Sequence, residues 1–387
     1  MEQEGEGMLN NKTLCFRLLT SFILLIAGGC SPESKKSGTA VEPSVKPVSS
    51  DSLHVAFSKG KFGYIDPRGN MVIDPVFEIA YVFRDGLAPV NTKGKWGYID
   101  STGWFVIDPV YSQVTPFKKG VARVNVVDKQ IYIGRDGKQI GNGAYDFAYH
   151  FSEGLAFVSV DGKYGAIDST GQMVIQPEYE LGYFFAHGLG LVKKDGRYGY
   201  IDKQGNKVVP PIYEEADSFW GSRAKVKVDG LWGFIDTVGA MVIEPKYEEA
   251  WGFIENRARV RCDGKWGYID IFGATVVDCL YDEAENYSEG FARVAKKNRW
   301  GCIDLSGKEI VPLVYQAVKP FGGGLAPVKK TKTWGYVDTS GVMVIEPRFN
   351  EAQSFFKGLA RVSLNGVEAY IDPGGKILWS EKPLPNE

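Results

Sequence analysis

The side chains that most often carry catalysis or bind metals are scarce in this chain of 387 residues. It has three histidines, His54, His150 and His187, and five cysteines. None of them stands in the H-x-x-x-H or C-x-x-C spacing that is typical of zinc sites. The sequence also lacks a G-x-S-x-G nucleophile motif and a G-x-x-x-x-G-K-[ST] phosphate loop. We therefore expect no catalytic residue, no cofactor and no metal site, and we predict that the protein is not an enzyme.

The spacing of the cysteines identifies no structural disulfide. Cys15 and Cys30 lie near the N-terminus, which leaves Cys262, Cys279 and Cys302 in the remainder of the chain. At most one disulfide can form among three cysteines. Because these three occupy different positions of the repeat described next, we expect buried free thiols.

A stretch of ten residues recurs along the chain and reveals its organisation. GKWGYIDSTG at residues 94–103 returns as GKYGAIDSTG at 162–171, GLWGFIDTVG at 230–239 and GKWGYIDIFG at 264–273. Steps of 34 residues from Trp96 pass through ten copies of the unit without an insertion or deletion. Such regular self-similarity predicts a tandem array of small units.

Four positions of the unit recur in nearly every copy: an aromatic residue, a glycine, an aspartate and a second glycine. The candidate structural residues at these positions are Trp96, Gly97, Asp100, Gly103, Trp232, Gly233, Trp266, Gly267, Trp300, Gly301, Trp334 and Gly335. Asp-x-x-Gly is typical of a type I turn in which the glycine is left-handed. A glycine within a strand predicts close approach of another group, here a large side chain of a neighbouring unit. Since a catalytic site is normally built once from unlike residues, the repetition favours packing and turn roles.

The unit is predicted to form short strands. Alternating and β-branched residues are interrupted by Gly or Pro about every eight residues, which excludes the helical pairs of tetratricopeptide repeats. A recurrent proline, from Pro75 to Pro347, is expected to end the third strand. We predict an all-β tandem array of ten three-stranded units over residues 53–379. An open β-solenoid-like superhelix is favoured, and a closed β-propeller-like ring is the alternative.

Charged residues recur beside the strands. Basic residues such as Lys61 and Lys265 precede the aromatic position, and acidic pairs such as Glu214-Glu215 follow a recurrent tyrosine. Because the net charge is only −2, solvated surfaces are favoured over a polyanion track or an acidic site for a cationic partner, and no nucleic-acid partner is expected. The aromatic position leaves open a ladder that stacks on sugars or on a peptide.

The N-terminal region has the features of an export signal. The apolar run LLTSFILLIAGG is too short to span a bilayer comfortably, and residues 1–29 are predicted to be a signal peptide, with Met8 as an alternative start. Residues 30–52 are rich in Ser, Pro and Lys and predict a flexible tether. Residues 380–387 are predicted to form a short C-terminal tail.

The end of the apolar run resembles the lipobox of bacterial lipoproteins. Gly28 and Gly29 precede Cys30, and Ala27 stands where such proteins usually have Leu. The resemblance implies that Cys30 becomes the mature N-terminus and carries acyl chains such as palmitate. These chains would anchor an exported protein to a membrane, facing the periplasm or the cell exterior. A plain secretory signal or an uncleaved anchor is the alternative.

The repeat itself resembles the bacterial WG-containing repeat family. The pattern W-G-Y-I-D…G…V-I-x-P-x-Y-x-x-A…F-x-x-G-L-A-x-V extends over about residues 53–379, although the units around Gln130 and Glu368 lack the Trp-Gly pair. The resemblance implies β-rich repeats on exported or surface proteins, with no common enzymatic activity. We expect an envelope lipoprotein that presents an extended surface to an unidentified protein partner. A cell-wall or surface polysaccharide is the alternative ligand.

Overall fold

Ten small antiparallel sheets follow one another along the chain. The computed structural model describes residues 49–383, so the predicted signal peptide, Cys30 and most of the tether lie outside the described residues. Eight of the sheets have four strands, the first has three and the third has two, and a short 3-10 helix, η1 (Ser50–Ser52), precedes them. The predicted all-β tandem array of ten units is confirmed. We call each sheet a blade and number the blades 1 to 10 in chain order.

Each blade is built from strands in the same order, from the centre of the ring outwards. The inner strands are β4 (Ile79–Ala80), β10 (Phe147–Ala148), β14 (Leu181–Ala186), β18 (Glu215–Ala216), β22 (Glu249–Ala250), β26 (Glu283–Ala284), β30 (Ala317–Val318) and β34 (Glu351–Ala352). The second strands are β1 (His54–Ser58), β5 (Ala88–Thr92), β8 (Val121–Val126), β11 (Leu155–Val160), β15 (Leu189–Lys194), β19 (Ala224–Val228), β23 (Arg257–Cys262), β27 (Phe291–Lys296), β31 (Leu325–Lys329) and β35 (Ala360–Leu364). The third strands are β2 (Lys61–Ile65), β6 (Lys95–Ile99), β9 (Lys129–Gly134), β12 (Lys163–Asp168), β16 (Arg197–Asp202), β20 (Leu231–Ile235), β24 (Lys265–Asp270), β28 (Arg299–Asp304), β32 (Trp334–Asp338) and β36 (Val367–Ile371). The outer strands are β3 (Met71–Phe77), β7 (Phe105–Tyr111), β13 (Met173–Tyr179), β17 (Lys207–Tyr213), β21 (Met241–Tyr247), β25 (Thr275–Tyr281), β29 (Glu309–Tyr315), β33 (Met343–Phe349) and β37 (Ile377–Ser380).

The inner strand is a correction to the predicted three-stranded unit. It is usually only two residues long, as in β4, where Ile79 and Ala80 pair with Asn91 and Val90 of β5. Such a short strand has no alternation of its own, so no periodic pattern in the sequence predicts it. Its backbone hydrogen bonds with the second strand nevertheless add a fourth strand to most blades.

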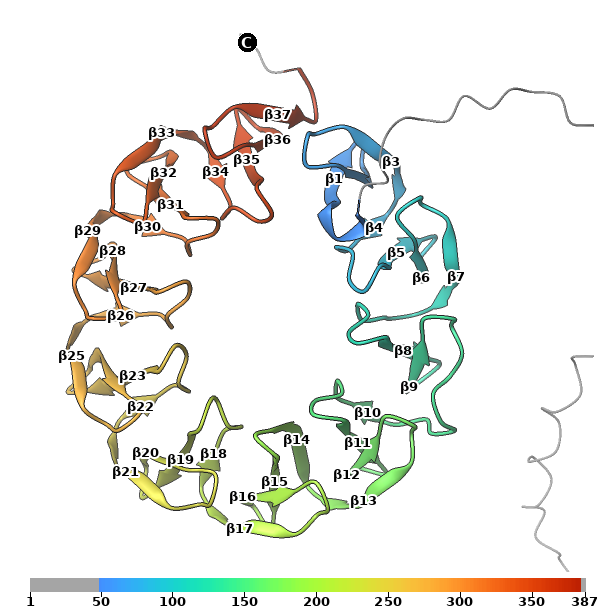
Figure 1. Ribbon diagram of the computed structural model, residues 1–387, viewed down its shortest axis with the longest axis vertical. Helices are drawn as coiled ribbons and strands as arrows, with labels where there is room; N and C mark the ends of the chain where they lie inside the picture. The colour runs from blue at the N-terminus through green and yellow to red at the C-terminus, as the bar shows by residue number, and fades with distance from the viewer. Residues whose placement is uncertain (1–48, 384–387) are drawn as a thin grey trace, which may run out of the picture. The chain divides into compact units, whose positions relative to one another are not determined.

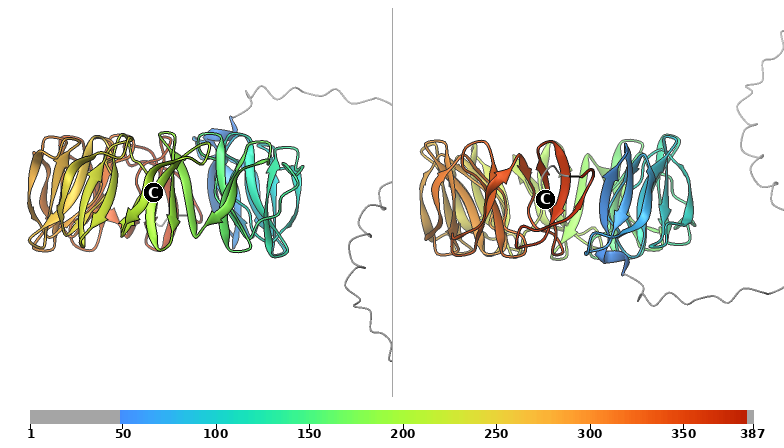
Figure 2. Two further views of the ribbon diagram at one scale, coloured as in Figure 1. Left: turned by 90° about the horizontal axis from the view of Figure 1, so that it is seen from below. Right: turned by 90° about the horizontal axis from the view of Figure 1, so that it is seen from above.

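The blades form a closed ring, which corrects the preference for an open superhelix (Figures 1 and 2). The Tyr370 hydroxyl of blade 10 donates a hydrogen bond of 2.6 Å to the backbone oxygen of Val55 in blade 1. A methyl group placed on Gly69 of blade 1 would lie 2.5 Å from the backbone oxygen of Leu378 in blade 10. These contacts between the first and last blades match the closed-ring alternative. The ring closes without exchange of a strand between the first and last blades, because β37 pairs with its own blade and not with blade 1.

The glycine of the Trp-Gly pair lets the outer strand cross over the third strand of the same blade. A methyl group on Gly97 would lie 2.5 Å from the backbone oxygen of Ile107 and 2.8 Å from the nitrogen of Pro109. The register shifts at this point, since Trp96 pairs with Tyr111 but Tyr98 pairs with Ile107. The group that approaches the glycine is therefore backbone of its own blade, and not the side chain of a neighbouring unit that we expected. The recurrent proline lies inside the outer strand at this bulge and does not end the strand, as bulges tolerate a residue without an N–H.

Two blades without this glycine support the same interpretation. Ile131 takes the glycine position in blade 3, and that blade has no outer strand, only single bridges such as Gln130 to Tyr145. Ala369 takes it in blade 10, where the outer strand β37 has four residues and pairs in register from Ala369 to Tyr370. A side chain at this position therefore coincides with loss of the crossing.

Aromatic contacts join neighbouring blades in a repeated way. The Tyr98 hydroxyl of blade 2 donates a 2.8 Å hydrogen bond to the backbone oxygen of Thr115 in blade 3, and its ring lies 4.8 Å from that of Phe117. The same pairing of rings 19 residues apart recurs at 4.7–5.1 Å in seven interfaces. Since rings at such distances stabilise beyond their burial, this contact is a main element of the inter-blade core.

Candidate functional site on the inner rim

The tryptophans of the recurrent Trp-Gly pair are packed between strands and are not displayed. Trp232 and Trp334 are buried, with 9% and 5% of their surface exposed, and Trp96, Trp266 and Trp300 are half-buried. Stacking on a sugar needs a free ring face. A ladder made by this column of residues therefore does not fit the structure.

The aspartates form the predicted turns. The backbone oxygen of Asp100 accepts a 3.0 Å hydrogen bond from the N–H of Gly103, and its carboxylate accepts a 2.9 Å hydrogen bond from the N–H of Thr102. Gly103 is left-handed, with a φ of 89°. In blade 9, the hydroxyl hydrogen bond from Ser340, together with backbone N–H donors, holds the pKa of Asp338 below its ordinary value. The carboxylates are therefore occupied by their own turns. Among residues 49–383, no group of three His, Cys, Asp or Glu side chains is placed to hold a metal ion.

The basic and acidic columns meet as ion pairs within blades. Lys61 Nζ lies 3.7 Å from a carboxylate oxygen of Glu78, and Lys265 contacts Asp282 in the corresponding place. Lys227 pairs with Glu215 at 2.7 Å. Several charges of both columns therefore have an opposite partner, which argues against an uninterrupted polyanion track or acidic strip along these blades.

Two cysteines that we expected to be free thiols form a disulfide. Cys262 lies at the end of β23 and Cys279 lies in the bulge of β25, with 6.0 Å between their Cα atoms. They meet because the outer strand crosses over Gly267, a geometry that the sequence spacing did not reveal. Cys302 is a buried thiol, as expected, and burial raises its pKa to about 12. Such a thiol is a poor nucleophile.

The histidines do not come together as a site. His150 lines a small pocket with Lys118 and Arg123, and burial followed by these two cations lowers its pKa. His187 is exposed on a turn, and its backbone N–H donates a 2.8 Å hydrogen bond to Glu153.

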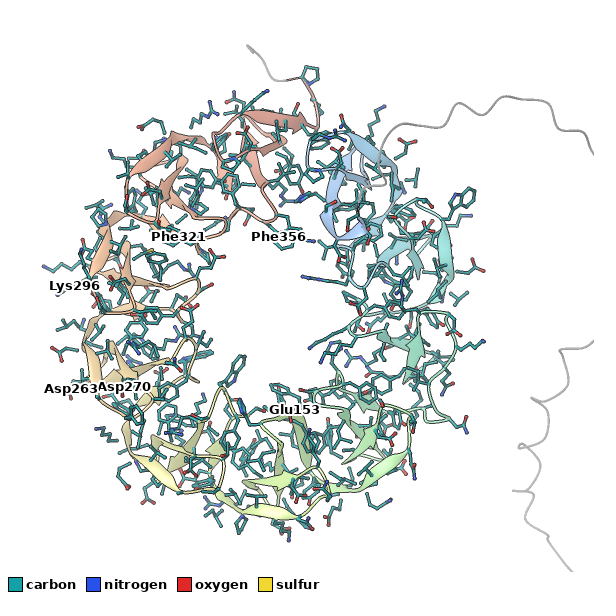
Figure 3. All side chains as sticks on the ribbon, viewed as in Figure 1. Glu153, Asp263, Asp270, Lys296, Phe321 and Phe356 are labelled. Carbon is teal, nitrogen blue, oxygen red and sulfur yellow. A yellow bond between two sulfur atoms is a disulfide. The ribbon has the colours of Figure 1, made fainter. Side chains whose placement is uncertain are left out.

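Residues that differ from blade to blade gather on the segments that connect each inner strand to the second strand. We call these segments the inner rim; they are residues 79–86, 113–120, 147–154, 181–188, 215–222, 249–256, 283–290, 317–324 and 351–358. Figure 1 shows the inner strands facing the centre of the ring. In Figure 3, Glu153 and Phe356 lie beside the central opening, which the side chains do not fill, whereas Lys296 and Asp263 lie at the periphery.

Exposed aromatic side chains mark several places on the inner rim. Tyr81, Trp220, Trp251 and Phe356 have 44–46% of their surface exposed. Tyr81 stacks on Trp96 with 5.1 Å between ring centroids and 11° between ring planes, so its outer face is free. Large aromatic side chains exposed beside polar ones are typical of binding surfaces.

The largest such group extends over blades 6 and 7, where cations alternate with indole rings. The Nζ of Lys225 lies 4.4 Å from the ring centroid of Trp232 and 5.5 Å from that of Trp251. The guanidinium carbon of Arg259 lies 4.3 Å from Trp251 and 5.2 Å from Trp266. Trp251 thus has two cations within reach of an attractive cation–π interaction, while 44% of its surface remains exposed.

Trp220 is fixed beside this group by a neighbouring backbone. A methyl group on Gly252 would lie 2.7 Å from the Cδ1 atom of Trp220, so the indole of blade 6 rests on bare backbone of blade 7. Trp220 and Trp251 therefore present two exposed indoles from adjacent blades. Packing against Gly252 holds Trp220 in position, and the contacts with Lys225 and Arg259 hold Trp251.

Hydrogen bonds between neighbouring turns hold the rim in place. The Glu153 carboxylate accepts the backbone N–H groups of His187 and Gly188 in the next blade, both at 2.8 Å. Asp85 accepts the N–H of Gly120 at 2.8 Å in the same manner. A surface ordered before binding loses less entropy when a partner docks.

Sequence reasoning missed the inner rim. A signal was present, because a small residue or valine followed three positions later by Phe or Tyr recurs in nine of the ten units, as in Ala250 and Phe253. Two buried positions in a segment of five residues do not define a period, however, and the exposed residues between them vary.

Comparisons with known proteins agree on the repeat and supply no function. The family model described as WG containing repeat matches nine segments, residues 62–96, 96–129, 132–164, 164–198, 198–232, 232–266, 266–300, 300–333 and 334–367. No curated protein matches the sequence. Among residues 49–383, no helix has the length and apolar character needed to cross a bilayer.

Solved structures show only distant likeness. The "eukaryotic initiation factor" has a TM-score of 0.49 and 9% identity, with 86% of this chain and 96% of that chain covered. The dihydro-heme d1 dehydrogenase NirN has a TM-score of 0.39 and 15% identity, with 88% of this chain and 74% of that chain covered. The structure of Hsv2p of Kluyveromyces lactis has a TM-score of 0.35 and 10% identity, with 57% of this chain and 89% of that chain covered. These scores are too low to transfer a function to this chain.

Proposed function

Because the chain belongs to the WG containing repeat family, we propose that it is a non-enzymatic envelope lipoprotein that binds a protein partner on its inner rim. The family assignment covers most of the chain and describes an architecture without a shared chemistry. The function must therefore be sought in residues that depart from the repeat.

The observation that carries the proposal is a division between recurrent and variable residues. The recurrent Trp, Gly, Asp and Tyr residues are engaged in bulges, turns and inter-blade contacts. The variable residues lie on the rim, where Trp220 and Trp251 are exposed beside Lys225 and Arg259. Exposed Trp side chains flanked by cationic and polar groups are among the residues that contribute most at protein interfaces.

The membrane part of the proposal is supported by sequence alone. Cys30 follows an apolar run and two glycines, and the chain from residue 31 to residue 48 separates it from the first described residue. A lipid on Cys30 would hold the ring at a membrane surface on a tether. The absence of an enzymatic role is likewise part of the proposal, supported by a thiol at Cys302 that is buried and by aspartates that are occupied by turns.

Affinity capture from envelope extracts tests the binding role. The full chain, extracted in mild detergent, is compared with a double variant, Trp220→Ala and Trp251→Ala. The matched control carries Trp104→Ala and Phe272→Ala, which removes side chains that are 77% and 73% exposed at turns away from the rim. We expect a protein captured by the wild type and the control to be lost from the rim variant. Equal capture by all three would refute the rim as the binding surface.

A polysaccharide is the second candidate ligand because Trp220 and Trp251 display two indoles from adjacent blades. Exposed indole faces also suit sugar rings, whose C–H groups pack on aromatic surfaces. Binding of purified cell-wall polysaccharide that is lost in the same rim variant, together with no captured protein, would favour this candidate.

A further inference from the structure

Among the described residues, blade 1 has no inner strand of the kind that eight other blades possess. Its sheet contains β1, β2 and β3 only, so β1 is an edge strand among the described residues. Strand β1 faces the centre of the ring, on the same side as the inner strands of the other blades (Figure 1). An edge strand offers unpaired backbone groups that can pair with an extended segment.

The contact between blades 10 and 1 differs from the contacts between the other blades. In blade 2, the backbone N–H of Tyr81 on the inner segment donates a 3.0 Å hydrogen bond to the oxygen of Pro89. The equivalent oxygen in blade 1 belongs to Val55, and it accepts the Tyr370 hydroxyl at 2.6 Å instead. In the six other interfaces that have this tyrosine, its hydroxyl bonds to a backbone oxygen on the inner rim of the next blade, as that of Tyr98 does. At the junction of blades 10 and 1, the Tyr370 hydroxyl therefore bonds to the second strand of the next blade, β1, and not to an inner-rim segment.

The aromatic packing at this junction is also incomplete. Among the described residues, Tyr370 has no ring partner of the kind that recurs at 4.7–5.1 Å elsewhere; its ring neighbours are His54 of blade 1 and Trp379 of its own blade, each with 6.0 Å between ring centroids. The residue equivalent to His54 is alanine or glycine in every other blade: Ala88, Ala122, Ala156, Gly190, Ala224, Ala258, Ala292, Ala326 and Ala360. His54 is 6% exposed, and its Nε2 has no hydrogen-bond partner among the described residues. A buried ring nitrogen without a partner is costly.

The nine inner-rim segments show which residues occupy the inner-strand position of a blade. Each has a small residue or valine followed three positions later by a phenylalanine or tyrosine, as in Ala352 and Phe355. The equivalent residues ahead of β1 are Lys46 and Ser49, which match neither requirement. The chain's own sequence is therefore a poor inner strand for blade 1.

We propose that the inner edge of β1 binds an extended segment of a partner protein that carries a small residue followed, three positions later, by Phe or Tyr. The segment adds the fourth strand of blade 1. Its aromatic ring packs on Tyr370, whose hydroxyl moves to a carbonyl of the segment, as Tyr98 bonds to Thr115. This inference rests on the proposed protein-binding role and names the segment that the partner presents.

A labelled peptide tests the inference on the full chain in detergent. The peptide copies residues 350–356, NEAQSFF, from blade 10 and is followed by fluorescence anisotropy and by hydrogen exchange of β1. We expect saturable binding and slower exchange in β1. A peptide with Ala in place of the residue equivalent to Phe355 should bind at least about tenfold more weakly, because the aromatic anchor is lost.

Two variants of the protein sharpen the test. His54→Ala installs the residue found in most other blades and should tighten peptide binding severalfold, whereas His187→Ala, at an exposed rim histidine, should leave it unchanged. Absence of binding, or equal binding of the Phe-lacking peptide, would overturn the inference. Binding seen only after deletion of residues 44–48 would also overturn it, since the chain's own segment would then be the occupant. If the peptide fails while envelope capture still depends on Trp220 and Trp251, the proposed function stands without this inference.

Discussion

The role of the strand glycine predicts a large effect from a very small change, Gly97→Ala. The added methyl group would lie 2.5 Å from the backbone oxygen of Ile107, where ordinary contact begins at 3.4 Å. The outer strand must therefore retreat by about 0.9 Å, and the obstructing atoms are backbone, which cannot rotate away. Overpacking of this kind costs about 1–3 kcal/mol, and each ladder hydrogen bond lost with it costs about 1 kcal/mol.

We therefore expect Gly97→Ala to lower the free energy of unfolding by about 2–3 kcal/mol. Urea unfolding followed by far-ultraviolet circular dichroism measures the change. Gly374→Ala is the matched control, because its methyl group meets only Asp372 Oδ1 at 3.4 Å and its φ is not left-handed. The control should shift stability by less than about 0.5 kcal/mol. If Gly97→Ala is as stable as this control, the crossing of the outer strand does not depend on the glycine and the reasoning is refuted.

Four further predictions concern other parts of the molecule. Tyr98→Phe removes the hydroxyl that bonds to Thr115 and should cost about 1 kcal/mol of unfolding free energy in the same urea assay. The lowered pKa of Asp338 means that its stabilising contribution is present above the ordinary carboxyl pKa and is lost as the pH falls through the lowered value, so the acid unfolding midpoint should move upwards in Asp338→Asn. Cys302, whose pKa is raised to about 12, should resist iodoacetamide at pH near 8 until urea unfolds the protein. Cys30→Ser should abolish acyl labelling and release the protein from membranes.

Each of these has a contrary result. An unchanged urea midpoint for Tyr98→Phe would show that the inter-blade hydrogen bond does not contribute to stability. An acid midpoint that does not move in Asp338→Asn would show that its turn does not contribute. Rapid alkylation of Cys302 in the folded protein would contradict its burial, and membrane retention of Cys30→Ser would favour an uncleaved anchor.

The local structure of each unit was predictable because it depends on residues close in sequence. Asp100 and Gly103 are three positions apart, and their turn needs no distant contact. Strand positions followed from the alternation of residues such as Trp96 and Ile99. The number of units followed from the repeat period alone.

The arrangement of the units depends on contacts that a period does not contain. Ring closure requires each blade to turn by a fixed angle relative to the last, and that angle results from packing such as Tyr98 on Phe117. The partner of Gly97 is its own outer strand, because a bulge around Pro109 brings distant backbone across it. The same crossing places Cys279 beside Cys262. None of these geometries produces a residue spacing in the sequence that differs from the spacing of an ordinary extended strand.

The claim that the inner rim is the binding surface is tested most directly by photo-crosslinking. A photoreactive phenylalanine analogue replaces Trp251 on the rim or Trp104, which is 77% exposed on the turn between β6 and β7. Each protein is irradiated in intact cells and its adducts are identified by mass spectrometry. We expect a discrete protein adduct from position 251 and none from position 104. Adducts from position 104 alone would contradict the account.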